Sequence, residues 1–166
     1  MRNLIAIPAI LMAVILQSAM ISRIYLLFGI ADLPLVMLAA WALQENVDSS
    51  WHWGMGFGFM VGFVSGIPWY VPVIGYCAVV AFAQILQRRV WQAPLLAMFS
   101  VTFLGTIILN LVSFAVLSLS GVVMPLEDVL GLLVLPSVLL NMLLAIPVYA
   151  VMRDLSRWVY PTPELE

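Results

Sequence analysis

Hydrophobic residues occur in six long runs, separated by short stretches that contain polar residues, proline or glycine. The runs cover residues 4–21, 32–44, 51–67, 71–86, 94–119 and 128–152. A helix needs about 20 residues to cross a hydrocarbon core about 30 Å thick, and the runs are close to this length. The pattern therefore predicts six membrane-spanning helices, the shorter of them irregular, partly broken or steeply packed. We expect residues 22–31 to extend the first or the second helix.

The composition indicates that the solvent around the protein is lipid. Hydrophobic residues make up 65% of the chain, charged residues make up 8%, and the mean hydropathy is +1.16. A soluble domain carries about a quarter charged residues. We therefore predict an all-α polytopic membrane protein, with residues 1–152 as one compact six-helix domain and residues 153–166 as a cytoplasmic tail. The first run lacks a convincing small-residue cleavage site, so we expect a retained helix rather than a signal peptide.

The arginines predict how the chain is oriented in the membrane. All six cations are arginine, and cytoplasmic loops carry an excess of positive charge. If the N-terminus is cytoplasmic, Arg23 alone lies outside, and the inside carries Arg2, Arg88, Arg89, Arg153 and Arg157. We therefore predict a multi-pass protein of the bacterial cytoplasmic membrane with both termini inside. So few cations form no basic face, which excludes nucleic-acid binding.

A glycine-rich stretch, WGMGFGFMVGFVSG, fills residues 53–66. Every fourth residue is glycine, at Gly54, Gly58, Gly62 and Gly66. A phosphate-binding loop would need a preceding strand and access to water, and neither is predicted here. On a helix the spacing gives one bare stripe along which backbones can approach. We interpret it as a helix-packing or partner interface, with close approach to a lipid or small molecule as the alternative.

Small and polar residues also recur every four residues in the last two runs. They are Thr102, Thr106 and Asn110 in one, and Ser137, Asn141, Ala145 and Tyr149 in the other. In the interpretation we favour, the two stripes face each other and the asparagines hydrogen-bond across the interface. In the alternative, the stripes line a polar pocket for a head group or solute. Pro136 and Pro147 would help such a pocket, because they free the carbonyls of residues 132 and 143.

The sequence offers no catalytic or metal-binding cluster. His52 is the only histidine and lies between two tryptophans, as expected of an interfacial residue, and Cys77 lies in an apolar run. All eight acidic residues, Asp32 among them, fall at helix ends, in loops or in the tail. We therefore expect no charged group in the middle of the membrane, no cofactor or metal, no enzymatic activity and no ion-coupled pump.

The chain resembles the rod shape-determining MreD family over nearly its whole length. The strongest match is in VLPSVLLNMLLAIPVYAVM, where Pro136, Asn141, Pro147 and Tyr149 occupy the positions of the family's closing motif. The glycine-rich stretch with Gly75-Tyr76 and the pair Asp32-Leu33 are also similar. Ser65-Gly66 is a departure, because the family often carries an aspartate there, and no role of that acid transfers to this chain.

The resemblance implies a non-enzymatic component of the bacterial cell-elongation complex, which builds peptidoglycan and sets cell shape. It would bind MreC directly and act with MreB filaments and the elongation peptidoglycan synthase. The family is also similar in architecture to substrate-binding subunits of energy-coupling-factor transporters, so a small-solute transporter subunit is the main alternative. The predicted outer loops around residues 22–31, 67–71 and 120–127 offer few hydrogen-bonding side chains, which disfavours that alternative. A lipid-dependent assembly factor without a cell-wall role is a third interpretation.

Overall fold

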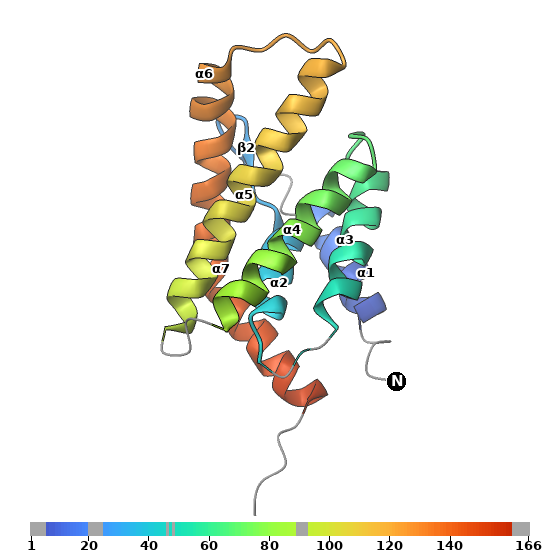
Figure 1. Ribbon diagram of the computed structural model, residues 1–166, viewed down its shortest axis with the longest axis vertical. Coiled ribbons are helices and arrows are strands. Elements are labelled where there is room, and N and C mark those ends of the chain that lie inside the picture. The colour runs from blue at the N-terminus through green and yellow to red at the C-terminus, as the bar shows by residue number, and fades with distance from the viewer. Residues whose placement is uncertain (1–5, 20–24, 46, 48, 89–92, 161–166) are drawn as a thin grey trace, which may run out of the picture.

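The computed structural model describes residues 6–19, 25–45, 47, 49–88 and 93–160. Over these residues the chain forms six helical rods and one small hairpin (Figure 1). The first five rods are α1 (Ala6–Ala19), α2 (Leu33–Ala42), α3 (Ser50–Val64), α4 (Tyr70–Gln87) and α5 (Pro94–Leu119). The sixth is continuous through α6 (Leu126–Asp128), the π-helix η3 (Val129–Val134) and α7 (Leu135–Val159).

The prediction that the chain is mostly helical is confirmed. Among the described residues, α4, α5 and the rod from Leu126 to Val159 are long and apolar enough to cross a membrane. The other helices are shorter, and the sequence predicted the shorter runs to be irregular, partly broken or steeply packed. At ten residues, α2 is only about 15 Å long. In contrast, α7 continues through residues 153–159, which the sequence assigned to the tail, because Ser156 and Val159 are buried against the bundle.

The prediction that residues 22–31 extend a helix is wrong over its described part. Two short strands form an antiparallel hairpin, β1 (Tyr25–Leu26) and β2 (Gly29–Ile30). Leu27 in the turn has a φ of 56°, a left-handed conformation that no α-helix contains. Residues 22–24 lie outside the described part of the chain. Hydrophobicity alone could not reveal this hairpin, because an apolar strand and an apolar helix end have similar composition.

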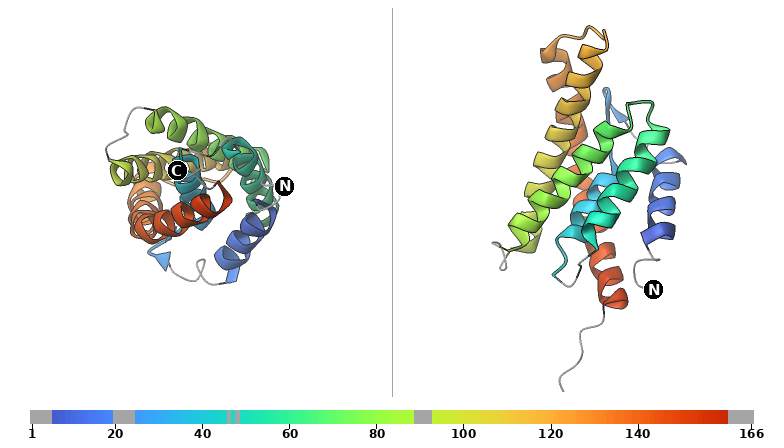
Figure 2. Two further views of the ribbon diagram at one scale, coloured as in Figure 1. Left: turned by 90° about the horizontal axis from the view of Figure 1, so that it is seen from below. Right: turned by 45° about the vertical axis from the view of Figure 1, so that its right-hand side comes forward.

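The bundle is built around α2, which lies among the other helices when the molecule is viewed along its length (Figure 2). Nine of the ten α2 residues are buried, all except Met37. The helix contacts α1, α3, α4, α5 and α7. Trp41 on α2 stacks on Trp53 of α3 with ring centroids 4.4 Å apart. Such a helix is apolar on every side because no side of it faces water.

The glycine stripe of α3 packs against α4, and its members differ in what they contact. A Cβ added at Gly58 would lie 2.5 Å from the Cα of Val73, and one at Gly62 would lie 2.8 Å from the Cα of Trp69. At Gly54 it would lie 3.0 Å from a Val80 methyl group. These three glycines therefore allow close approach of two helices. Gly66 does not share this role, because it lies in the α3–α4 turn with a φ of 68° and nothing within 4 Å of an added Cβ.

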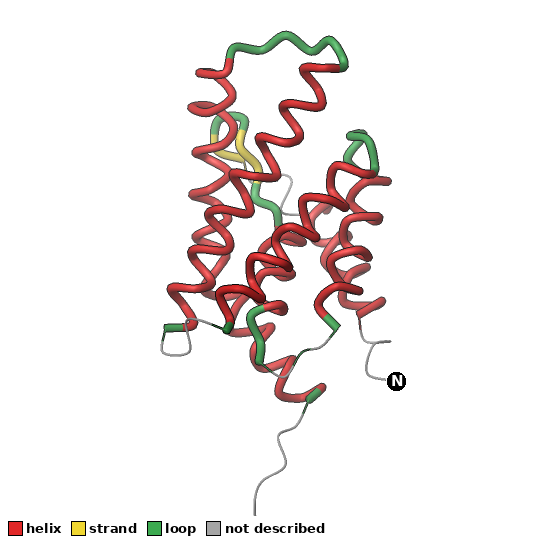
Figure 3. The backbone as a smooth tube through the Cα atoms, in the orientation of Figure 1, coloured by secondary structure: helices red, strands yellow, loops and turns green. Residues whose placement is uncertain are grey.

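The two ends of the bundle carry different connections (Figures 1 and 3). The starts of α1, α3 and α5 and the ends of α2, α4 and α7 lie toward the bottom of Figure 1, which we call the lower end. The α3–α4 turn and the α5–α6 connection lie at the opposite, upper end. The described arginines Arg88, Arg153 and Arg157 belong to the lower end. The positive-inside rule therefore predicts that the lower end is cytoplasmic.

Cysteine labelling tests this orientation. In a Cys77→Ser background, Val123→Cys places a thiol on the upper connection, where the side chain is 97% exposed. Asp154→Cys places one at the lower end, where the side chain is 69% exposed. An impermeant maleimide is expected to label Val123→Cys in intact cells and Asp154→Cys only after lysis. The reverse pattern would show that the chain is inserted the other way.

Candidate functional site

The chain from Phe28 to Asp32, which leads from the hairpin turn to α2 and which we call the extended segment, lies beside α7, with Gly29 and Ala31 buried and Phe28 and Ile30 exposed. Every second N–H group of this segment donates to α7 or to the π-helix before it. The bonds run from Phe28 N to the Leu132 oxygen (3.0 Å), from Ile30 N to Ser137 Oγ (3.2 Å) and from Asp32 N to Asn141 Oδ1 (2.6 Å). Non-helical backbone is tolerated at membrane depth only where protein groups satisfy it. Ser137 and Asn141 therefore supply acceptors that a helix would otherwise provide internally.

Pro136 contributes to the same contact. Proline has no N–H group, so the Leu132 oxygen four residues earlier is free to accept from Phe28. A Cβ added at Gly29 would lie 2.6 Å from both the Pro136 Cβ and the Ser137 nitrogen. Only glycine allows the strand to approach the helix this closely. The Leu132 carbonyl, which the sequence predicted to be freed by Pro136, is thus hydrogen-bonded to the backbone of Phe28.

Gln17 of α1 holds the other side of the extended segment. Its Nε2 donates to the Ala31 oxygen (2.7 Å), and its Oε1 accepts from Leu33 N (2.9 Å). One amide side chain therefore satisfies backbone groups on both sides of Asp32. Since α1 and α7 each hold the segment, the start of α2 is fixed from both directions.

Asp32 is the N-cap of α2. Its Oδ1 accepts from Leu35 N at 3.0 Å, and both carboxylate oxygens lie 3.0 Å from the Tyr76 hydroxyl of α4. This helix end lies deep in the bundle, about 15 Å of α2 away from the lower end. Asn141 connects Asp32 to Thr106, which is close to the middle of α5. Asp32 is therefore at a helix end, as predicted, but this end lies inside the bundle rather than at its surface.

A cavity of about 450 Å³ opens above this segment. The polar side chains of its wall include Gln17, Asp32, Tyr76, Thr106, Asn110, Ser137 and Asn141. Most of the remaining wall is apolar and includes Leu35, Leu109, Phe114 and Leu133. Ser65 and Ile67 of the α3–α4 turn and Met124 of the α5–α6 connection also line it. The cavity thus runs from a polar floor at the centre of the bundle toward the upper end.

The two polar stripes predicted from the sequence meet at this floor. Asn141 Nδ2 donates to Thr106 Oγ1 (2.9 Å), and Asn110 Nδ2 donates to the Thr106 oxygen within α5 (2.8 Å). The two asparagines therefore use different atoms of Thr106 rather than each other. Both line the cavity together with Thr106 and Ser137. The predicted alternatives of an interface and a pocket consequently coincide in one place.

Other predicted site residues lie away from the cavity wall. Thr102 is fully buried in α5, and its hydroxyl finds no hydrogen-bond partner in the described part of the chain. Pro136 packs against Gly29 behind the extended segment. Pro147 lies inside α7, and Tyr149 is buried in the main core. The stripe on α7 thus serves the cavity only in its upper half.

Three contributors to the site were not predicted from the sequence as site residues. Gln17 was hidden in an apolar first helix, Tyr76 was noted only for family resemblance, and Asp32 was treated as a surface cap. A glutamine in an otherwise apolar span is itself a signal, because an amide in lipid requires partners. Asp32 followed by Pro34 correctly marked the helix start, but its depth depends on tertiary packing.

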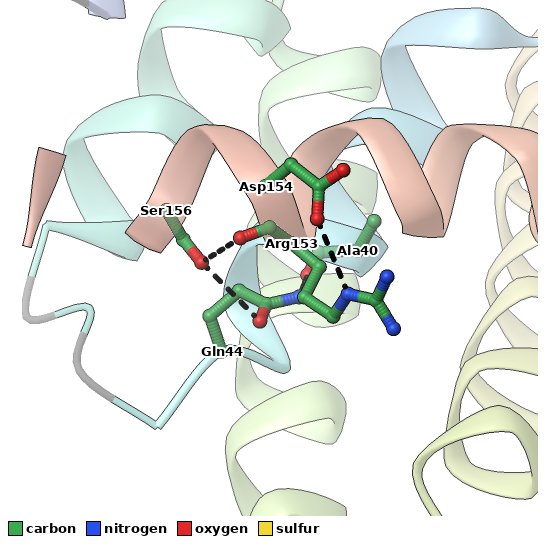
Figure 4. Close-up of polar contacts among 5 residues, drawn as sticks. All are labelled: Ala40, Gln44, Arg153, Asp154 and Ser156. Carbon is green, nitrogen blue, oxygen red and sulfur yellow. Dashed lines mark hydrogen bonds and ion pairs between the residues drawn. The ribbon is translucent and has the colours of Figure 1, made fainter. Parts of the chain in front are cut away.

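A second polar cluster closes the lower end (Figure 4). Gln44, beyond the end of α2, donates to the Ala40 oxygen (2.9 Å), and its Oε1 lies 3.4 Å from Ser156 Oγ on α7. Ser156 Oγ also donates to the Arg153 oxygen at 2.7 Å. The adjacent Arg153–Asp154 ion pair (3.4 Å) is exposed. The cluster joins α2 to α7, and we assign it a structural role.

Within the described residues, no three His, Cys, Asp or Glu side chains lie together as a metal site requires. Comparisons of the chain with protein-family models, with curated proteins and with solved structures found no match.

Proposed function

We propose that this protein is a non-enzymatic membrane component of the bacterial cell-elongation complex. In this role it binds MreC and helps to couple MreB filaments to peptidoglycan synthesis. The observation that carries the proposal is the use of the residues that resemble the MreD motif. Asn141 and Pro136 hold the extended segment, and Asp32 begins the helix at its end. The residues that carry the resemblance are therefore the same residues that hold the centre of the bundle together, and this supports the proposal.

The orientation is part of the proposal. With the arginine-bearing lower end in the cytoplasm, the lower end faces MreB filaments and the upper end faces the periplasm. MreC spans the membrane once and carries a large periplasmic domain, so a complex with it would involve the membrane and the upper end. The proposed location is the bacterial inner membrane, with both termini cytoplasmic.

Co-purification from membranes in mild detergent tests the proposal. A tagged chain is expected to retain MreC, together with the elongation peptidoglycan synthase in smaller amounts. An unrelated six-span membrane protein carrying the same tag is the control for non-specific capture. Absence of MreC under conditions in which the chain stays folded would contradict the proposal.

A solute-binding subunit of an energy-coupling-factor transporter is the second candidate. The observation that favours it is the cavity, because the helices supply hydrogen-bonding side chains that the outer loops lack. Such a subunit would retain a pair of ATPases and a large coupling subunit in the same co-purification. The identity of the retained partners therefore separates the two candidates.

A further inference from the structure

We propose that the central cavity binds a largely apolar molecule that carries one ammonium group, and that this group pairs with Asp32. The proposal goes beyond membership of the elongation complex and does not depend on it. It rests on the unused hydrogen-bonding capacity of the cavity floor, on the absence of a protein cation near Asp32 in the described part of the chain, and on the apolar walls.

The carboxylate of Asp32 has acceptor capacity that the protein does not use. Its two oxygens offer about four lone-pair sites. The bonds described to them come from Leu35 N and the Tyr76 hydroxyl. Tyr76 contributes a single proton to the carboxylate. At least one acceptor site therefore remains open where Asp32 lines the cavity.

No cation of the described chain pairs with Asp32. The only ion pair among the described residues is Arg153–Asp154, which is exposed at the lower end. A carboxylate buried in the membrane is unfavourable unless a cation or several donors compensate it. A bound ammonium group provides both the charge and up to three N–H donors. A ligand with an ammonium group would therefore supply the positive charge that the described residues do not place beside Asp32.

The other polar groups at the floor favour the same ligand. Both amide ends of Asn141 are used, by Asp32 N and by Thr106 Oγ1. Asn110 donates through Nδ2 to the Thr106 oxygen, while its Oδ1 has no hydrogen bond described. Open acceptors therefore lie on Asp32 and on Asn110, while Ser137 Oγ accepts from Ile30 N and its own O–H has no acceptor described. Acceptors of this kind recognise a donor or a cation rather than an anion.

The size and depth of the cavity limit the rest of the ligand. Ligand pockets usually measure about 300–1,000 Å³, and this cavity of about 450 Å³ falls at the small end. Its mainly apolar wall suits a hydrocarbon or aromatic body. The ammonium group of a phospholipid normally lies at the membrane surface, whereas Asp32 lies about 15 Å of helix inside. A free amine fits this depth better than an aminolipid.

Thermal unfolding of the full chain in a neutral detergent tests the proposal with three six-carbon probes. Hexylamine is expected to raise Tm in a saturable manner, whereas hexanol and hexanoate, which share its chain, should not. Asp32→Asn is expected to raise the apparent Kd for hexylamine about tenfold or more, because the charged partner is lost. Asn110→Ala should raise it by a smaller factor.

Equal shifts with hexylamine and hexanol would overturn the proposal, as would an unchanged Kd in folded Asp32→Asn protein. If Asp32→Asn does not fold, Asn110→Ala decides, and an unchanged Kd there would also overturn it. Nanodiscs distinguish the source of the ammonium group. Loss of the hexylamine effect in phosphatidylethanolamine but not in phosphatidylcholine would support the site with an aminolipid as its occupant, whereas retention in both supports a free amine.

Discussion

Gly58→Ala is expected to lower the free energy of unfolding by about 1–3 kcal/mol, the usual range for overpacking. The new Cβ would lie 2.5 Å from the Cα of Val73, which is backbone of α4 and cannot rotate away. Alanine is a better helix former than glycine by about 1 kcal/mol, so helix propensity acts in the opposite direction. A loss of stability would therefore report the α3–α4 contact. Thermal or denaturant unfolding in detergent measures it.

Gly131→Ala is the matched control for this substitution. Gly131 lies in the π-helix with nothing within 4 Å of an added Cβ. This variant is expected to be neutral or slightly stabilising. Gly56 is unsuitable as a control although it lies off the stripe, because its Cβ would meet Ile10 of α1 at 2.7 Å. Equal stability of the Gly58 and Gly131 variants would contradict close packing of α3 on α4.

Asn141→Ala is expected to have an effect of similar size through a different mechanism. The fully buried amide accepts from Asp32 N and donates to Thr106 Oγ1. Its removal leaves the Asp32 N–H unsatisfied away from bulk water, which is unfavourable by about 1–3 kcal/mol. The Thr106 hydroxyl loses one donor but still donates to the Thr102 oxygen. The start of α2 should loosen as well. Unfolding in detergent and hydrogen exchange at residues 30–35 measure the two consequences.

Asn110→Ala is the control, since Asn110 is half-buried and its described bond stays within α5. We expect the free energy of unfolding to fall by less than about 1 kcal/mol. The Asn110 side chain is half-buried, and its removal takes only one donor from the Thr106 carbonyl oxygen. The double variant should deviate from the sum of the two by less than a directly bonded pair would, because the asparagines do not bond each other and are coupled only through Thr106. A loss at Asn110 equal to that at Asn141, with strong coupling between them, would instead indicate direct pairing.

Much of the fold could be predicted from the hydrophobic pattern. The ranges predicted for α3, α4 and α5 agree with the structure to within a few residues, since long apolar runs in lipid have essentially one regular solution. The glycine spacing correctly indicated a packing stripe at Gly54, Gly58 and Gly62. Gly66 differs because the helix ends before it, and helix ends are the least certain feature of such a pattern.

The centre of the bundle could not be predicted in the same way. Its construction depends on contacts between residues more than 100 positions apart, such as Ile30 with Ser137 and Asp32 with Asn141. The spacing on α5 and α7 identified two polar faces that meet, but not the backbone segment that also bonds to Ser137 and Asn141 of α7. The residue pattern of the sequence shows that Asp32 begins a helix. How deep in the bundle Asp32 lies depends on how that helix packs against the others.

Reagent access tests most directly the central claim that the cavity reaches the middle of the bundle from the upper end. In a Cys77→Ser background, Asn110→Cys places a thiol in the cavity wall. Ile108→Cys, two residues earlier on α5, places one on an exposed apolar position outside it. A small impermeant methanethiosulfonate added to intact cells should modify Asn110→Cys and leave Ile108→Cys unmodified. Equal reactivity at the two positions, or modification of Asn110→Cys only after lysis, would contradict the account.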